Sequence, residues 1–138
     1  EGHLICNHST SHRDMSKIAD FETFALEISK IEQIYKEQTG KEMSKFFRPP
    51  EGRFSETTLE FANKLGYKTV FWSLAYADWD NKNQPDPEKA KQLILSRMHN
   101  GCVLLLHPTS ATNAQIMDGL ITELKNRGYE FGRLDEFE

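Results

Sequence analysis

Short apolar runs alternate with helical patterns along the whole sequence, and this alternation constrains the fold more than any other feature. An apolar run at residues 4–6 leads into a loop rich in His and Ser, and apolar residues then recur at steps of three and four until Gly40. This order predicts a strand, a loop and an amphipathic helix. Because the order recurs along the chain, the sequence favours an α/β fold with a parallel sheet.

The expected elements follow from the same patterns. Ser55 is a suitable helix N-cap and Gly66 a suitable stop, so a helix is predicted between them. The predicted strands cover residues 4–6, 45–48, 67–74, 102–106 and 129–134. One predicted helix ends near residue 40, and three others cover residues 55–65, 87–99 and 113–126. A long polar loop at residues 80–88 is of a kind that is often functional in compact domains.

Composition and the start of the chain bound the class of protein. With 38% apolar and 28% charged residues among 138, the chain is expected to form one globular domain. Its formal net charge of -4 is spread without a Lys/Arg block, which argues against nucleic acid as a partner. No apolar run reaches the roughly 18 residues of a membrane-spanning helix. The start, EGHLICNHS, lacks a Met and the features of a signal peptide, so we expect a longer protein.

Polar residues suited to chemistry each follow the end of a predicted strand. These residues are His8, His12, Arg48, Asp78 and His107. In parallel α/β folds the carboxyl ends of the strands form the edge where sites are built. The sequence therefore predicts a site at this edge.

His8 and His12 are the candidate metal ligands. Their spacing of four residues brings two imidazoles to one side of a helical turn, so that both can bind one ion. Two loop histidines at this spacing also arise by chance. A catalytic zinc ion usually has three protein ligands, and no third ligand is evident, since Asp14 is expected to be a solvated or helix-start residue.

Two further segments leave alternatives open. RPPEG places Arg48 before a stiff turn, which either presents the guanidinium and the following backbone N–H groups to a ligand or is a plain strand-to-helix turn. Glu51 in this turn is as consistent with a solvated side chain as with a functional one. His107 directly follows the apolar run CVLLL. It is either a site residue or a structural histidine whose ring is hydrogen-bonded within the fold.

Taken together, HSTSH, RPPEG, ADW and LLLH resemble motifs two to five of the NodB-type polysaccharide deacetylases, carbohydrate esterase family four. The resemblance covers essentially the whole chain and looks most like the peptidoglycan branch that makes muramic δ-lactam in spore cortex. It implies a distorted (β/α) barrel with parallel strands, incomplete at the N-terminus. Residues 1–138 would be the C-terminal part of a single catalytic domain.

The resemblance also implies roles for individual residues. His8 and His12 would be the two histidine ligands of a divalent metal, zinc or another ion such as cobalt. Asp78 would hold and polarise His107, the general acid that protonates the leaving sugar amine. Arg48 would orient the family's catalytic Asp.

The remaining implied roles concern the acetyl group of the substrate. The backbone N–H of Glu51 would donate, with the metal, to the developing oxyanion. Because a backbone group does this, the role survives although many relatives have Tyr at this position. Trp79 and Leu105 would form walls around the acetyl methyl, and Pro50 would also contact the substrate.

The sequence departs from the family pattern at two further points. The first motif, a TFDDG-like segment that carries the base Asp and the Asp metal ligand, does not occur in the 138 residues. Ala75 replaces the first Asp of the commoner DxxDW pattern, whereas Asp78 keeps the second. We therefore expect this chain to be inactive on its own and part of a longer enzyme.

The expected activity of the full-length protein is metal-dependent removal of N-acetyl groups from a cell-wall glycan. Peptidoglycan N-acetylmuramic acid is the first expected substrate, and a polysaccharide of N-acetylglucosamine such as chitin is the second. A glycan-binding relative that has lost catalysis and an unrelated α/β domain with chance histidines are the rival interpretations. The resemblance implies a bacterial protein that acts outside the cytoplasm, at the cell envelope.

Overall fold

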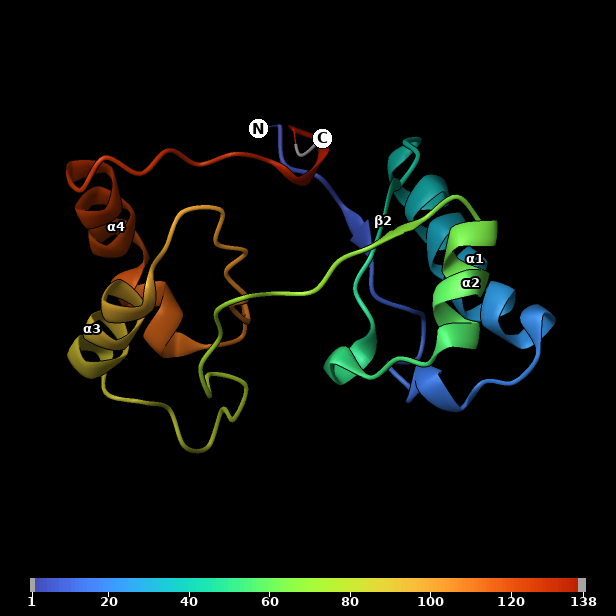
Figure 1. The fold of residues 1–138 in the computed structure, drawn as a ribbon, viewed down its shortest axis with the longest axis horizontal. Coiled ribbons are helices and arrows are strands. Elements are labelled where there is room, and N and C mark those ends of the chain that lie inside the picture. The colour runs from blue at the N-terminus through green and yellow to red at the C-terminus, as the bar shows by residue number, and fades with distance from the viewer. Residues whose placement is uncertain (1, 137–138) are drawn as a thin grey trace. The chain divides into compact units, whose positions relative to one another are not determined.

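The computed structural model describes residues 2–136 (Figure 1). The chain divides into two compact units. The described part of the first comprises residues 2–71 and 133–136, and the second is Trp72–Gly132. The expectation of a single catalytic domain stays a prediction.

The first unit is built on a parallel three-stranded sheet in the order β1-β2-β3. Its strands are β1 (Cys6–Asn7), β2 (Ser44–Phe47) and β3 (Lys68–Thr69). Parallel neighbours need a crossover, and α1 (Phe21–Thr39) and α2 (Glu56–Lys64) supply the two crossovers. The predicted parallel α/β class is confirmed.

Local sequence signals set the helix ends of this unit. The Asp20 side chain accepts a hydrogen bond from the Thr23 backbone N–H at the start of α1, and Gly40 ends that helix with φ of 69°. Ser55 and Thr58 form a capping box at the start of α2. The predicted end of the first helix and the predicted N-cap of the second are therefore confirmed.

The core of the first unit lies where α1 and α2 cover the sheet. Phe24 on α1 is fully buried, and its ring packs edge-on against Phe47 at 5.8 Å between centroids. The buried members of this core are Met15, Ile18, Phe24, Ile28, Phe47, Ala62 and Tyr67. Met15 comes from a short 3-10 helix, η1 (Met15–Lys17), so the segment after the His-rich loop is anchored in the same core.

The second unit pairs two helices, α3 (Pro87–Arg97) and α4 (Ala111–Asn126). Against them lie two extended segments joined by a parallel bridge between Leu74 and Leu104. The buried apolar core comprises Leu74, Ala90, Ile94, Leu95, Ile116, Leu120 and Leu124. Neither of the two helices, nor any other helix within residues 2–136, is long and apolar enough to cross a membrane.

Three predicted strands differ from the structure. The predicted strand 67–74 shortens to β3, and the predicted strand 102–106 is reduced to the bridge at Leu104. The predicted strand 129–134 is wrong: this stretch is irregular and leads into a 3-10 helix, η3 (Leu134–Glu136). A strand needs a neighbour that pairs with its backbone, and no strand of the described residues pairs with this stretch.

Replacing Phe24 by Ala is expected to lower the free energy of unfolding by roughly 3–5 kcal/mol, because it empties a buried aromatic site. Leu26 on the same helix is 65% exposed. Leu26→Ala is therefore expected to change the free energy by less than about 0.5 kcal/mol. Urea denaturation followed by circular dichroism measures both variants. Equal losses would contradict the assignment of the buried face of α1.

Candidate active site

The loop that carries His8 and His12 leaves β1 in an unusual backbone conformation. Ser9 and His12 have positive φ values of 65° and 55°. A left-handed conformation costs a non-glycine residue about 1–2 kcal/mol, so it has to be held by its surroundings. The Ser9 backbone N–H donates to Asn7 Oδ1 at 2.9 Å, and the His12 backbone N–H donates to Ser9 Oγ at 3.1 Å. Short polar side chains of the loop thus fix its shape.

Helix α1 holds the same loop through Glu27. The Thr10 backbone N–H and hydroxyl donate to the Glu27 carbonyl oxygen at 3.0 and 2.8 Å. The Ser11 backbone N–H donates to Glu27 Oε2 at 3.1 Å, and the Ser11 hydroxyl lies 2.9 Å from both carboxylate oxygens. Glu27 was not predicted as a site residue, because the helical pattern gives no sign of its loop partners.

His8 and His12 are in contact, with ring centroids 4.9 Å apart and planes at 80°. His8 Nδ1 lies 2.6 Å from the Arg48 carbonyl oxygen. Because a carbonyl only accepts, Nδ1 carries the proton and the lone pair of His8 lies on Nε2. Metal-binding histidines commonly donate their second ring N–H in this way. The donor type and tautomer therefore fit a divalent ion such as zinc or cobalt.

The two imidazoles supply part of such a metal site. Within residues 2–136 no group of three His, Cys, Asp or Glu side chains could hold a metal ion. Asp14, the nearest carboxylate in sequence, caps η1 instead and pairs with Arg53 at 3.1 Å. The hydrogen bond from the Ser16 hydroxyl, with smaller contributions from Arg53 and Lys17, outweighs desolvation and lowers the pKa of Asp14 to about 2. Its expected position at a helix start is confirmed.

The RPPEG turn follows β2 directly. The Arg48 backbone N–H donates to the Asn7 carbonyl oxygen at 3.0 Å, which ties this turn to the base of the His loop. The guanidinium is half-buried, and burial lowers the pKa of Arg48. Pro49 and Pro50 are fully buried. The two prolines thus anchor the turn in the interior of the first unit.

Glu51 occupies a short 3-10 turn, η2 (Pro50–Gly52), with φ of 55°. Its side chain is exposed and pairs with Arg53 Nε at 3.0 Å. Arg53 also contacts Asp14, so one guanidinium joins the RPPEG turn to the segment after His12. The position of the Glu51 backbone thus depends on neighbours that the motif does not contain.

The second unit brings together Asp78 and His107. Asp78 is fully buried, and its Oδ1 lies 2.7 Å from His107 Nδ1. Its Oδ2 accepts the His107 backbone N–H at 2.7 Å. The imidazole itself is 32% exposed, and no residue of the described chain bonds to Nε2. A carboxylate that orients one ring nitrogen and leaves the other accessible is the arrangement of a general acid or base.

The hydrogen bonds to Asp78 keep it ionised. Burial raises the pKa of Asp78, but the His107 backbone N–H, the Asn113 amide and the His107 ring outweigh it. The net effect holds the pKa of Asp78 below its ordinary value. Asp78 therefore acts as a negative partner of the imidazole.

Residues that the sequence did not single out complete this cluster. Asn113 Nδ2 donates to Asp78 Oδ2 at 2.6 Å, and Gln84 Nε2 donates to the Asp78 carbonyl oxygen at 3.2 Å. Gln84 lies in the polar loop that was expected to be functional. Asn113 carries no signal beyond its place in the first turn of a capped helix.

Two of the predicted substrate contacts, Trp79 and Leu105, lie between Asp78 and His107 in the sequence. Trp79 directly follows Asp78 and is 63% exposed, whereas Leu105 is half-buried and donates its backbone N–H to the Leu74 carbonyl oxygen at 2.9 Å. The predicted site residues thus form two clusters, one in each unit. The roles assigned to these residues stay predictions.

Comparison with known proteins gives consistent matches. A family profile described as "Polysaccharide deacetylase" matches residues 1–70. The peptidoglycan-N-acetylmuramic acid deacetylase PdaA of Bacillus subtilis is 43% identical over 137 residues, which are 99% of this chain and 51% of that protein. The peptidoglycan-N-acetylglucosamine deacetylase PgdA of Listeria monocytogenes is 30% identical over 136 residues, which are 99% of this chain and 28% of that protein.

A solved structure gives a similar result. The structure of Bacillus subtilis PdaA, a family 4 carbohydrate esterase, matches with a TM-score of 0.92 and 38% identity over 98% of this chain and 57% of that chain. The chain thus spans about half the length of PdaA.

Glu27→Ala is expected to speed hydrogen exchange at the Ser11 amide by roughly tenfold or more, because a hydrogen bond to a charged acceptor is worth about 1.5–3 kcal/mol. Glu37→Ala is the matched control, since Glu37 lies on the same helix and accepts from Gln33 instead. Exchange measured by NMR at the Ser11 amide reports the effect. The same exchange rate in both variants would contradict the role of Glu27 in holding the loop.

Proposed function

The chain belongs to the polysaccharide deacetylase family, and from this membership we propose that the whole protein hydrolyses N-acetyl groups of a bacterial cell-wall glycan. The observation that carries the proposal is the buried Asp78 carboxylate 2.7 Å from His107 Nδ1. Removal of an acetyl group leaves a sugar amine, which needs a proton as its bond to carbon breaks. An oriented imidazole with an accessible second nitrogen is suited to deliver that proton.

The proposed proton path uses two residues of the second unit. Asp78 would fix the orientation of the His107 ring through its hydrogen bond to Nδ1. His107 Nε2–H then donates to the leaving nitrogen as the amide bond breaks, so that acetate and a free amine result. Exposure of the imidazole edge is consistent with this role, because the substrate nitrogen has to reach Nε2.

His8 and His12 would hold a divalent ion, zinc or cobalt, which when bound would polarise the acetyl carbonyl and lower the pKa of a bound water. The His8 tautomer and the contact between the two rings support this assignment. Arg48 would orient a catalytic carboxylate of the full-length protein. The backbone N–H of Glu51 would donate to the oxyanion.

The first proposed substrate is N-acetylmuramic acid of peptidoglycan, with muramic δ-lactam of spore cortex as the end product. The 43% identity to a protein named as a muramic acid deacetylase supports it over N-acetylglucosamine, for which the named relative is 30% identical. Trp79 and Leu105 would form walls around the acetyl methyl, and Pro50 would contact the substrate. Because peptidoglycan lies outside the cytoplasmic membrane, the proposal places the whole protein at the cell envelope.

The activity is tested by acetate release from purified peptidoglycan glycan strands by the full-length protein. His107→Ala is expected to lower kcat by roughly 10²–10⁴-fold, because the proton donor is lost. His99→Ala is the matched control, since His99 lies in the same unit and bonds to Ser73 and the Arg97 carbonyl. Retained turnover in His107→Ala would end the general-acid assignment.

Glycan binding without any acetate release by the unsubstituted protein would favour the non-catalytic alternative, and release from N-acetylglucosamine alone would favour the second substrate.

Metal content tests the histidine assignment independently. His8→Ala and His12→Ala in the full-length protein are each expected to lower bound zinc or cobalt, because each removes one imidazole ligand. Elemental analysis after dialysis measures the content, and His107→Ala should leave it unchanged. Equal metal content in all three variants would refute the assignment of His8 and His12.

A further inference from the structure

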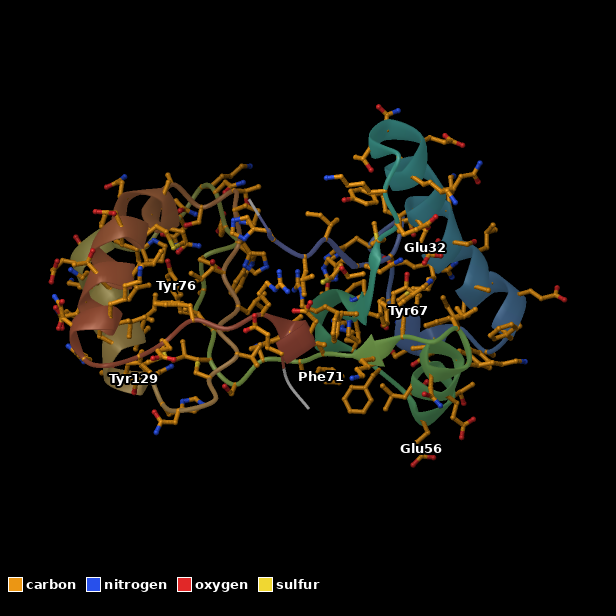
Figure 2. The ribbon with its side chains drawn as sticks, turned by 90° about the horizontal axis from the view of Figure 1, so that it is seen from above. Glu32, Glu56, Tyr67, Phe71, Tyr76 and Tyr129 are labelled. Carbon is orange, nitrogen blue, oxygen red and sulfur yellow. The ribbon has the colours of Figure 1, made fainter. Side chains whose placement is uncertain are left out.

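We infer that Asn113 is a positioning residue for His107 and that Tyr76 sets the orientation of the Asn113 amide; the inference rests on the proposed function of His107 as a general acid. Both residues lie in the second unit, in which Figure 2 labels Tyr76. Asn113 lies outside the motifs that resemble the family, and Tyr76 occupies an unspecified position of the DxxDW pattern. Asn113 contacts Asp78 and His107, and Tyr76 contacts Asn113.

The amide of Asn113 uses both of its N–H groups on the Asp78–His107 pair. Nδ2 donates to Asp78 Oδ2 at 2.6 Å and to the His107 carbonyl oxygen at 3.0 Å. Asn113 is only 3% exposed. One buried amide therefore holds the carboxylate and the backbone of the histidine at the same time.

The helix start fixes where this amide lies. Asn113 is the third residue of α4, and its backbone N–H donates to the Ser110 hydroxyl at 3.1 Å in the N-cap. The Ser110 hydroxyl donates in turn to Gln84 Oε1 at 2.7 Å. Because both neighbours are engaged, the backbone of Asn113 has little freedom to move.

Tyr76 decides which way the amide faces. Its hydroxyl donates to Asn113 Oδ1. A flipped amide would place Oδ1 against Asp78 Oδ2 and the His107 carbonyl oxygen, and three acceptors would then meet without a hydrogen between them. The flipped amide would also leave the Tyr76 hydroxyl facing another donor. Only the observed orientation satisfies all of these groups.

The consequence for His107 follows from the two oxygens of Asp78. Oδ2 accepts from the His107 backbone N–H and from Asn113, which leaves Oδ1 directed at His107 Nδ1. The ring proton is thereby held on Nδ1, and protonation to the imidazolium adds its proton at Nε2, where a substrate amine would receive it. The titratable groups that face Asp78 are His107 and Tyr76, and burial together with the negative charge of Asp78 raises the pKa of Tyr76. The Tyr76 hydroxyl thus remains a donor.

The test combines a structural readout with kinetics in the full-length protein. ¹⁵N NMR of labelled histidine, at a pH where imidazoles are neutral, reports which ring nitrogen of His107 carries the proton. We expect the Nδ1–H tautomer alone in the unsubstituted protein, and a mixture of tautomers in Asn113→Ala and in Tyr76→Phe. We also expect kcat for acetate release to fall roughly 10- to 100-fold in Asn113→Ala, with KM unchanged.

The double variant tests whether Tyr76 acts through Asn113. If it does, Tyr76→Phe added to Asn113→Ala should change neither the tautomer populations nor kcat any further. Additive effects would overturn this order of action. Asn126→Ala and Tyr129→Phe are the matched controls, since Asn126 is exposed at the end of α4 and Tyr129 packs against the same core.

The outcomes separate this inference from the proposed function. An unchanged Nδ1–H tautomer in Asn113→Ala overturns the positioning role, whatever the activity. If Asn113→Ala does not fold, Tyr76→Phe removes one oxygen atom and decides the same question: an unchanged tautomer there overturns the inference. If the unsubstituted protein releases no acetate, the proposed function fails, while the tautomer comparison still tests the contacts.

Discussion

A single buried charge, the Asp78 carboxylate, organises the second unit. Burial removes the water that would solvate this charge, so the neighbouring residues have to supply hydrogen bonds to it. They come from the His107 ring and backbone and from the Asn113 amide. Each donor is fixed by its own element, the extended segment at Leu104 or the first turn of α4. The hydrogen bonds that satisfy this one carboxylate thus orient the imidazole and engage the Asn113 amide.

The first unit also contains a buried polar side chain, Asn7, whose neighbours supply its hydrogen bonds. Asn7 is 1% exposed, and its Nδ2 donates to the Ile28 carbonyl oxygen and lies 3.2 Å from the Tyr67 hydroxyl, while its Oδ1 accepts from Ser9. The Tyr67 hydroxyl donates to Glu32 at 2.5 Å; Figure 2 labels both residues. In each unit a buried Asn beside a Tyr joins the end of an extended segment to a helix. Both predicted functional loops therefore rest on hydrogen bonds of buried amides, which are directional and tolerate little displacement.

The sequence predicted features that depend on neighbouring residues better than features that depend on distant ones. The helix ends at Ser55 and Gly40 follow from capping chemistry, and the family resemblance and its α/β fold are confirmed by the profile and structural matches. The strand expected at residues 129–134 was wrong, because a strand depends on a partner that a local pattern does not reveal. The role of Asn113 was not predicted for the same reason, because its partners His107 and Asp78 lie 6 and 35 positions away.

These contacts also bear on substrate choice. In the proposed reaction, the Asp78–His107 pair and its Asn113 support would act on the leaving nitrogen, which is the same in every N-acetyl sugar. They therefore cannot distinguish muramic acid from glucosamine, whose difference lies in the lactyl group on the ring. Under this proposal, discrimination would come from side chains that reach the rest of the sugar. Trp79 directly follows Asp78 in the second unit, and the ion-paired Glu51 and Arg53 side chains are exposed in the first unit.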